Sequence, residues 1–455
     1  IDLIPPKMIT FQDVEKKRMK VLVLGSGAKD HAIAWWFSKS RLIEGLYVAP
    51  SNPGTESFAV NLPDVDPADK DQVLKACKDN GIDFVFIGTE KPLFTGVIDH
   101  LNKNGISTFG APGYALKLEG DRKFAREFAK RHNIPVPEYH VFEKSSEISA
   151  FLDENEGRTF TIKSNELSPS RMMIHSNDKN ELISYAMELF KKGPVVMEDC
   201  IDGIGVTASI LVDNEGYYVL PICSEYTKRE HTDKGVGTPT GGMGAVCPVS
   251  ISQEALDLIS KTIIHPTFKA LKEENLYYKG VLTFSIVLSP NGPFLVDYHV
   301  RLNDPATQAM VPLIRNDLIE LMVAMQNNTL KRIAPDVTDQ SSVSVVIASE
   351  GYPNDTKTGA KLQSVDPRYL GNFIDDGAYV FFGAVKRKAN GEIYTTGGRA
   401  ATIVGLGQNI IEANSKAYGA IDAIEFDGSW YREDIGNKFF ENVSEDRQSR
   451  ADLQN

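Results

Sequence analysis

Met19-Lys20-Val21-Leu22-Val23-Leu24-Gly25-Ser26-Gly27 joins a short apolar run to a glycine turn, and a helical pattern through Ala32, Ile33, Trp36 and Phe37 follows it. An apolar run that ends in glycine and precedes apolar residues at helical spacing is typical of a strand, a tight turn and a helix. The sequence therefore predicts that the fold begins with a strand and helix unit of an α/β sheet.

The same pattern recurs before residue 120. Glycine or proline follows each of three further apolar runs, Leu46-Tyr47-Val48-Ala49, Phe84-Val85-Phe86-Ile87 and Thr108-Phe109. Strands that alternate with helices predict a parallel, doubly wound sheet over residues 19–120. Ligands bind such sheets at the carboxyl ends of the strands, so we expect part of a binding site there.

Gly25 and Gly27 lie at one of these strand ends. The loop amides could cradle a phosphate, and a plain chain-turning role explains the two glycines equally well. The dinucleotide fingerprint is incomplete, because Asp30 stands where its next glycine is expected. A nicotinamide cofactor is therefore disfavoured, and with it the oxidoreductase class.

The middle of the chain predicts a different architecture. A helix over Arg122–Arg131 is followed by strands and helices without a regular alternation, which indicates an α+β region over residues 121–335. Beyond it, short apolar runs separated by glycine turns predict a small, sheet-rich domain over residues 336–455. In its first run, Val343–Ile347, alternate residues would share one buried face.

Composition excludes several classes of protein. The 455 residues carry a net charge of -12, which argues against broad nucleic-acid binding, and no apolar run is long enough to span a bilayer. The polar segment of residues 1–18 lacks a signal-peptide core and is either a native extension or an added tail. The four cysteines form no C-x-x-C pair, so we expect a protein of the reducing cytoplasm.

A second informative stretch is Asp297-Tyr298-His299-Val300-Arg301-Leu302-Asn303-Asp304, which follows the apolar Phe294-Leu295-Val296. On a strand, residues two apart share a face, so Asp297, His299 and Arg301 would project into one cleft. A carboxylate, an imidazole and a guanidinium together could hold a divalent metal and a polyphosphate. The alternative is an edge strand with a solvated polar face.

Motifs along nearly the whole chain give these patterns a common explanation. The chain resembles the phosphoribosylamine-glycine ligase (glycinamide ribonucleotide synthetase) family of ATP-grasp ligases over residues 19–436. The matching motifs are Gly25-Ser26-Gly27-Ala28-Lys29-Asp30-His31-Ala32, Gly88-Thr89-Glu90-Lys91-Pro92-Leu93, Leu118-Glu119-Gly120-Asp121-Arg122-Lys123-Phe124-Ala125, Thr240-Gly241-Gly242-Met243-Gly244-Ala245, Asp304-Pro305-Ala306-Thr307-Gln308, Thr396-Gly397-Gly398-Arg399 and Tyr431-Arg432-Glu433-Asp434-Ile435-Gly436.

The resemblance implies that ATP drives the joining of glycine to 5-phosphoribosylamine through an acyl phosphate, with residues 121–335 as the ATP-grasp domain. It implies Mg or Mn as the metal, with other divalent ions as alternatives. The roles implied for individual residues are Arg301 and Asp304 in catalysis; Lys123, Lys163, Glu198, Asp199 and Ile201 in ATP binding; Gly25, Gly27, Lys228, Gly241, Gly242 and Arg399 in substrate binding; and Asp297 and His299 at the metal.

The sequence departs from the family pattern at four places, one of which is the substrate loop, Tyr226-Thr227-Lys228-Arg229. The glycine-rich lid is replaced by Asn165-Glu166-Leu167-Ser168-Pro169-Ser170-Arg171, in which only Arg171 keeps a cation. Gly205 stands where the family has a ribose-binding glutamate, and Asp297 and His299 replace glutamate and asparagine. Two hypotheses follow: a ligase with an altered metal or amino-acid preference, and a binding or regulatory protein that has lost ATP turnover.

Overall fold

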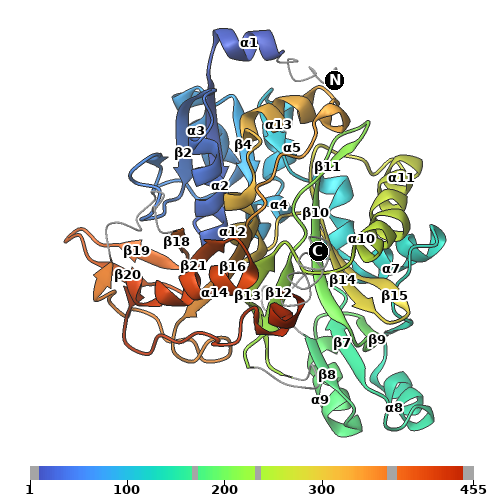
Figure 1. Cartoon of the computed structure of the whole chain (residues 1–455). Helices are drawn as coiled ribbons and strands as arrows, with labels where there is room; N and C mark the ends of the chain where they lie inside the picture. The colour runs from blue at the N-terminus through green and yellow to red at the C-terminus, as the bar shows by residue number, and fades with distance from the viewer. Residues whose placement is uncertain (1–9, 167–172, 231–236, 366–376, 444–455) are drawn as a thin grey trace, which may run out of the picture.

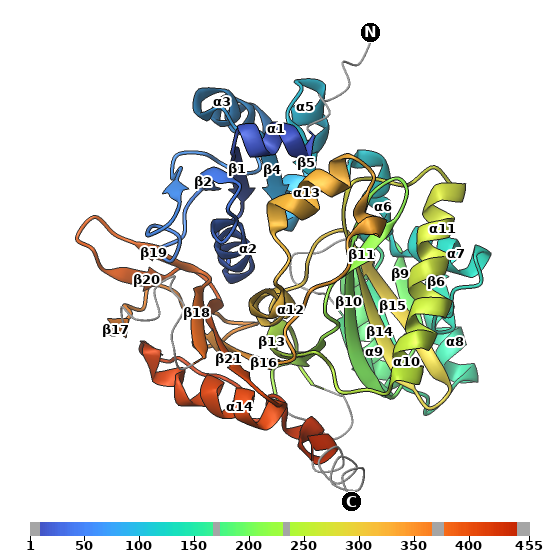
Figure 2. The ribbon, with the colours of Figure 1, turned by 45° about the horizontal axis from the view of Figure 1, so that its top comes forward.

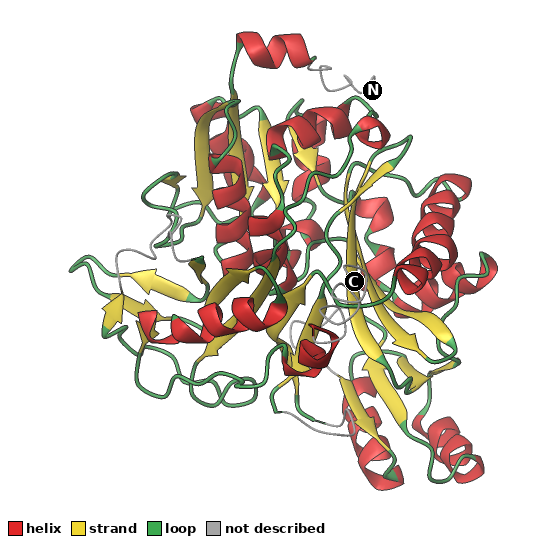
Figure 3. Ribbon diagram, in the orientation of Figure 1, coloured by secondary structure: helices red, strands yellow, loops and turns green. Residues whose placement is uncertain are grey.

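The computed structural model describes residues 10–166, 173–230, 237–365 and 377–443. Three regions meet in it, coloured blue, green to yellow, and orange to red along the chain in Figure 1. The first is a parallel sheet with helices on both faces, and the other two are built on antiparallel sheets, as the secondary-structure colours of Figure 3 show. The predicted fold class, an α/β chain of these three parts, is confirmed.

The N-terminal region is doubly wound. Its parallel sheet has the strand order β3-β2-β1-β4-β5. The elements are α1 (Phe11–Lys16), β1 (Met19–Leu24), α2 (Ala28–Ser38), β2 (Ile43–Ala49), β3 (Val60–Asn61), α3 (Lys70–Asn80), β4 (Phe84–Ile87), α4 (Glu90–Phe94), α5 (Val97–Lys103) and β5 (Ser107–Phe109). Residues alternate between two cores: Val21 and Val23 of β1 pack with α2, and Leu22 and Leu24 pack with α3 and α5.

Helix α2 is buried on all sides between this sheet and later parts of the chain. Every residue from Ala28 to Phe37 is buried, as expected for a helix without a polar stripe. Its far side packs on α12 (Ala306–Met310) and α13 (Leu318–Gln326), and Trp36 Nε1 donates a hydrogen bond of 3.0 Å to the Asn316 carbonyl. Contacts between distant parts of the sequence therefore hold the glycine loop at the start of α2 in place.

The central region contains two antiparallel sheets (Figure 2). The first has the order β6-β9-β7-β8, and its elements are β6 (Tyr139–Phe142), α8 (Ser145–Glu154), β7 (Phe160–Ser164), β8 (Met173–Ser176), α9 (Lys179–Phe190) and β9 (Val195–Asp199). The second has the order β11-β10-β14-β15, and its elements are β10 (Ile204–Val212), β11 (Tyr217–Val219), α10 (Gln253–Ile259), α11 (His265–Glu273), β14 (Gly280–Ser289) and β15 (Gly292–His299). Helices α6 (Lys117–Gly120) and α7 (Arg122–Arg131) connect the N-terminal region to them.

Strand β15 ends before Arg301, which the sequence predicts to share its cleft face, and its pairing is irregular. Its pairing with β14 shifts between Ser285 and Ile286, so that Val296 is an extra residue of the kind found in a β-bulge. The strand ends at His299, and the backbone N–H of Val300 donates to the Glu119 carboxylate at 2.9 Å. A side chain from α6 thus takes over the hydrogen bonding where the strand stops.

The C-terminal region is a five-stranded sheet of order β12-β13-β16-β21-β18. Its elements are β12 (Ser224–Lys228), β13 (Pro239–Cys247), β16 (Ser341–Ala348), β18 (Ala378–Phe382), β21 (Arg399–Gly407) and α14 (Ile410–Gly419), with the short pairs β17 (Ser364–Val365) and β22 (Ile424–Glu425), and β19 (Val385–Arg387) and β20 (Ile393–Thr395) beside it. The prediction that Val343, Val345 and Ile347 share one buried face is confirmed, and the other face of β16 is buried as well. This strand lies in the middle of the sheet, in contact with α14 and α12.

None of the described helices is long and apolar enough to cross a membrane. The four cysteines, all within the described residues, are free thiols, and Cys77, Cys223 and Cys247 are buried.

Candidate active site

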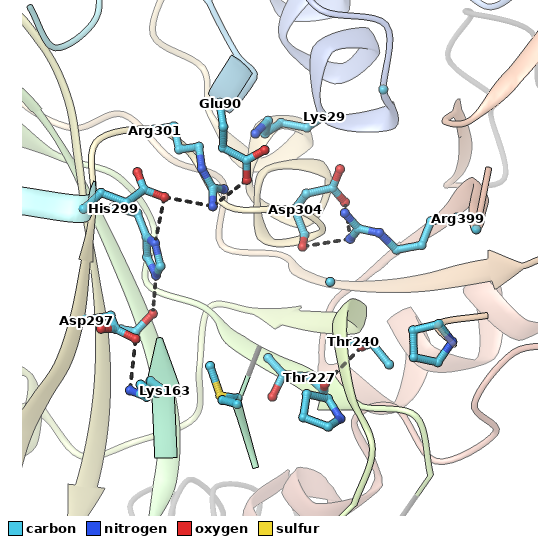
Figure 4. Close-up of a pocket in the computed structure, with 18 of the residues that line it drawn as sticks. Lys29, Glu90, Lys163, Thr227, Thr240, Asp297, His299, Arg301, Asp304 and Arg399 are labelled. Atoms are coloured by element: carbon cyan, nitrogen blue, oxygen red, sulfur yellow. Dashed lines mark hydrogen bonds and ion pairs between the residues drawn. The ribbon is translucent and has the colours of Figure 1, made fainter. Parts of the chain in front are cut away.

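A cleft of about 1460 Å³ lies where the three regions meet. The N-terminal sheet contributes the loop from Gly25 to Asp30, the first central sheet contributes β7 and β8, and the second contributes the end of β15. Arg399 of β21 lines the cleft from the C-terminal sheet. In Figure 4, Lys163 of β7 points toward Asp297 of β15, and Arg399 of β21 points toward Asp304.

One end of the cleft holds a cluster of cations around Asp297. Lys163 Nζ lies 3.1 Å from Oδ2 of Asp297, and Arg126 Nη2 and Arg122 Nε lie 3.1 and 3.4 Å from its Oδ1. Burial by itself would raise the pKa of the Asp297 carboxyl, but Lys163, Arg122 and Arg126 hold that pKa well below its ordinary value. Asp297 is therefore an ionised counter-charge for three cations.

Arg126 connects this cluster to Glu198 on β9. Its guanidinium donates to Glu198 Oε1 from two nitrogens, at 3.1 and 2.5 Å, and Lys163 lies 3.6 Å from the other carboxylate oxygen. Arg126 is 1% exposed and Glu198 is 2% exposed, so water screens the pair little. Two carboxylates face three cations here, which leaves a positive excess suited to an anionic ligand.

Glu119 organises the middle of the cleft. It accepts from the Val300 amide, lies 3.3 Å from His299 Nδ1 and forms an ion pair of 3.0 Å with Arg301. The same guanidinium reaches Glu90 at 2.7 Å, as the dashed lines of Figure 4 show. Burial alone would raise the pKa of Glu119, but Arg301, His299 and the Val300 amide together lower that pKa to about 2. Glu119 thus holds Arg301 and His299 in fixed positions.

Asp304 and Arg399 form the other end. Arg399 Nη1 lies 3.1 Å from both the side-chain Oδ1 and the carbonyl oxygen of Asp304, and Gln308 donates to the same Oδ1 at 2.8 Å. Gly242 has a φ of +126°, and a Cβ there would lie 2.6 Å from the Asp304 carbonyl oxygen. The glycine-rich strand β13 can therefore approach the Asp304 loop only without a side chain.

Lys29 and Asp30, at the start of α2, line the cleft from the N-terminal region. Lys29 Nζ donates to the Leu302 carbonyl at 3.0 Å, and burial followed by the nearby Arg301 lowers the pKa of Lys29. Asp30 accepts from the Gly27 amide through Oδ2 at 2.9 Å, while its Oδ1 is buried without a hydrogen-bond partner among the described residues. A Cβ on Gly88 would lie 2.1 Å from that Oδ1, so only glycine leaves room for the carboxylate.

The buried carboxyl of Asp30 gives a testable pH dependence. Burial raises the pKa of Asp30 from 3.8 to about 6, against the opposing effect of Lys29. A pKa that is higher in the folded state favours folding below pH 3.8, and this advantage is lost as the pH rises to about 6. At 1.36 kcal/mol per pKa unit, the loss is on the order of 3 kcal/mol.

We therefore expect Asp30→Asn, which does not titrate, to gain stability relative to the wild type between pH 4 and pH 7. Urea unfolding at pH 4.5 and pH 7.5 measures the difference between the two proteins at each pH. The exposed Asp79→Asn serves as the control, and its difference in unfolding free energy from the wild type should be the same at both pH values. An equal difference at both pH values for Asp30→Asn would contradict this account.

The structure brings most of the predicted site residues to the cleft. Among the described residues, its lining includes Gly25, Gly27, Lys163, Glu198, Asp199, Ile201, Gly241, Asp297, His299, Arg301, Asp304 and Arg399. Lys123 is not among them: it is exposed on α7, where Arg122 and Arg126 point inward instead. Lys228 and Gly242 adjoin lining residues without lining the cleft themselves, and Arg171 lies outside the described residues.

The sequence predicts no role for several residues that lie in or beside the cleft. Glu119 and Glu90 lie within two of the family motifs, so their positions in those motifs could have indicated a role in the site. Arg126 follows Arg122 by four positions on α7, the spacing that places both on one helix face. Thr161, His175 and Cys200 also line the cleft, and no motif pointed to them.

The predicted metal ligands differ in how well they suit an ion. Both oxygens of Asp297 contact cations, and both ring nitrogens of His299 are used, one toward Glu119 and one toward Ser285 Oγ at 3.1 Å. Among the described residues, no three His, Cys, Asp or Glu side chains gather as a metal cluster. Magnesium often binds one carboxylate plus substrate phosphates, so Asp297 could bind a magnesium ion that enters together with a nucleotide. His299 instead connects Glu119 to Ser285.

Comparisons with known proteins agree with this geometry. Three protein-family models match the chain in order. They describe the N domain of phosphoribosylglycinamide synthetase, over residues 19–119, its ATP-grasp (A) domain, over 120–307, and its C domain, over 342–438. A phosphoribosylamine-glycine ligase of Clostridium acetobutylicum is 32% identical over 428 residues, which cover 92% of this chain and 99% of the relative.

Two solved structures extend the comparison. The crystal structure of phosphoribosylamine-glycine ligase from Thermotoga maritima matches with a TM-score of 0.77 and 26% identity, covering 91% of this chain and 99% of that one. The biotin carboxylase domain of 2-oxoglutarate carboxylase from Hydrogenobacter thermophilus, solved with MgADP, matches with a TM-score of 0.67 and 15% identity, covering 91% and 92%. The second likeness shows a shared fold alone.

Proposed function

Because this chain belongs to the phosphoribosylglycinamide synthetase family, we propose that it is an ATP-dependent ligase that joins glycine to 5-phosphoribosylamine. The observation that carries the proposal is the convergence of Lys163, Arg122 and Arg301 on one cleft that the glycine loop and Arg399 close from the other side. Cations at both ends suit two phosphate-bearing substrates. We expect the reaction to take place in the cytoplasm.

The proposed reaction has two steps. The glycine carboxylate attacks the γ-phosphorus of ATP, so ADP leaves and glycyl phosphate forms. The amine of 5-phosphoribosylamine then attacks the acyl carbon, inorganic phosphate leaves, and the nitrogen loses a proton as the amide forms. Because charge builds on the transferring phosphoryl oxygens, catalysis depends on fixed cations and on the exclusion of water.

The contacts in the cleft suggest how the residues divide this work. Lys163 and Arg122 would neutralise the triphosphate, and Arg301, fixed by Glu119, would stabilise the transferring phosphoryl group. Asp304, held by Arg399, would orient the acceptor substrate near the loop of Gly25. A magnesium or manganese ion bound with the nucleotide would supply further neutralisation of phosphate charge, and Asp297 is placed to hold it.

A steady-state assay tests the proposed function. Purified protein is incubated with ATP, magnesium or manganese, glycine and freshly prepared 5-phosphoribosylamine, and ADP and the amide product are measured by mass spectrometry. We expect both products, in equal amounts, only when all substrates are present. ADP formation without the amide, or no ADP with either metal, would contradict the proposal. Other small amino acids in place of glycine test the substrate preference.

A second candidate is a binding protein that no longer turns ATP over. The observation in its favour is that three cations already neutralise Asp297, so a metal ion would have to compete with them. Calorimetry with a non-hydrolysable ATP analogue separates the two candidates. Tight binding that depends on the metal supports the ligase, and binding that is the same with a chelator, in a protein without turnover, supports the second candidate.

Gly205 allows a gain-of-affinity prediction. It pairs with Val287, which lines the cleft, and a Cβ at Gly205 would meet no described atom within 4 Å. Residues directly opposite on paired strands share a face, so a glutamate there could reach the ribose hydroxyls. We expect Gly205→Glu to tighten ATP binding about ten-fold, measured by calorimetry, because hydrogen bonds to a charged acceptor contribute about 1.5 kcal/mol or more.

Gly205→Gln is the matched control, since it has the same length without the charge. It should give a smaller gain than Gly205→Glu. Equal affinities for the wild type and Gly205→Glu would show that the ribose does not lie near this strand.

A further inference from the structure

The sheet that carries Lys163 has a polar row on its cleft face. Thr161 of β7 pairs directly with His175 of β8 on one side and with Glu198 of β9 on the other, and all three line the cleft. The intervening residues, such as Phe160 and Ile162, pack into the separate core formed with α8 and α9. The position of His175 in the cleft is therefore fixed by strand register, not by a loop.

The hydrogen bonds of His175 leave one ring nitrogen for a ligand. Its Nδ1 lies 2.6 Å from Thr161 Oγ1 and 4.0 Å from Cys200 Sγ. Its Nε2 makes no hydrogen bond within the described part of the chain. This nitrogen is not fully buried, so a ligand in the cleft can reach it. Burial, with Lys228 and Lys163 nearby, lowers the pKa of His175 to about 3, so the ring is neutral at physiological pH.

The place of this pair along the strand indicates what it would meet. Thr161 precedes Lys163 by two residues on the same face, a separation of about 7 Å along a strand. A ligand whose phosphates lie at Lys163 would therefore present its non-phosphate end to Thr161 and His175. Apolar Val287 and Val296 line the same cleft from the second sheet, as expected around a flat ring.

We propose that His175, oriented by Thr161, contacts the base of the bound nucleotide and helps to set its preference among nucleoside triphosphates. This proposal rests on the proposed function, because it takes ATP as the ligand. His175 and Cys200 supply only two soft donors, and no third gathers with them among the described residues, so a metal site does not explain the pair. A neutral imidazole can form a hydrogen bond to a base edge or stack on its face.

Calorimetry with two ligands tests the proposal. ATP carries a base, and inorganic tripolyphosphate presents the phosphates alone. His175→Phe keeps a ring and removes its nitrogens, so we expect the Kd for ATP to rise roughly three- to ten-fold, as for one lost neutral hydrogen bond. The Kd for tripolyphosphate should stay unchanged. The effect should be the same at pH 6 and pH 8, because the ring is neutral at both.

Substitutions of Thr161 provide the matched control. Thr161→Val removes the hydroxyl at nearly constant shape and should weaken ATP binding in the same direction, whereas Thr161→Ser keeps the hydroxyl and should bind ATP as the wild type does. Equal losses for both ligands, or ATP binding unaffected by His175→Phe and Thr161→Val, would overturn this inference while leaving the proposed function intact. A wild-type protein that binds tripolyphosphate but not ATP would overturn both.

Discussion

Arg301→Lys is expected to lower kcat about 10²- to 10³-fold, the loss seen when one preorganised charge-stabilising group is removed from an active site. Arg301 is 7% exposed, and a single guanidinium reaches both Glu119 and Glu90, at 3.0 and 2.7 Å. Lysine keeps the charge, but its compact ammonium group lacks the planar set of N–H donors with which a guanidinium can hold both carboxylates and a phosphoryl group. The rate of ADP formation under saturating substrates measures the effect.

Arg315→Lys is the control for this change, because Arg315 is exposed and its ion pair with Asp336 lies at the surface. It should leave kcat unchanged. Circular dichroism confirms that both variants are folded at the assay temperature. A kcat for Arg301→Lys within three-fold of the wild type would show that Arg301 is structural, and the role given to it in phosphoryl transfer would be wrong.

Asp297→Asn is expected to cost about 3–5 kcal/mol of unfolding free energy, the usual penalty for removing one partner from a buried ion cluster. Lys163, Arg122 and Arg126 would keep their charges and lose their shared carboxylate, and among the described residues Glu198 alone would remain as an ion-pair partner of Lys163 and Arg126. Urea unfolding at pH 7 measures the loss. Tripolyphosphate should restore more stability to the variant than to the wild type, because an anion replaces the missing charge.

The exposed Asp336→Asn is the control for Asp297→Asn and should shift the unfolding free energy by less than about 1 kcal/mol. If tripolyphosphate stabilised the wild type and Asp297→Asn equally, the cations around Asp297 would not be an anion site. The phosphate-binding role of Lys163 would then have to be abandoned.

Much of the fold could be predicted from local patterns. The helix over Arg122–Arg131 has the predicted bounds, and the strand at Phe84–Ile87 does as well, because apolar spacing and flanking glycine or capping residues act locally. The burial of the other face of β16 could not be predicted in the same way. Ser342 and Ser344 are fully buried, because α12 packs on β16 from elsewhere in the chain.

The site could be predicted where charged or polar residues stand two apart on one strand, because such residues share a face. Asp297 and His299 do share the cleft face, although the strand ends before Arg301. The partners of these residues were not predictable from the sequence, because Arg126 and Glu119 lie far from them along the chain and meet them only through packing of α6 and α7 on β15. For the same reason, the motif containing Lys123 located the correct helix but not the side chains that face the cleft.

The central claim is that this cleft activates a carboxylate by phosphorylating it with ATP. Turnover with glycine labelled with ¹⁸O in its carboxylate tests it most directly, with mass analysis of the released phosphate. The account predicts that one ¹⁸O atom is transferred to phosphate for each amide formed, because the attacking oxygen stays with phosphorus when the acyl phosphate breaks down. ADP formation accompanied by unlabelled phosphate would contradict it.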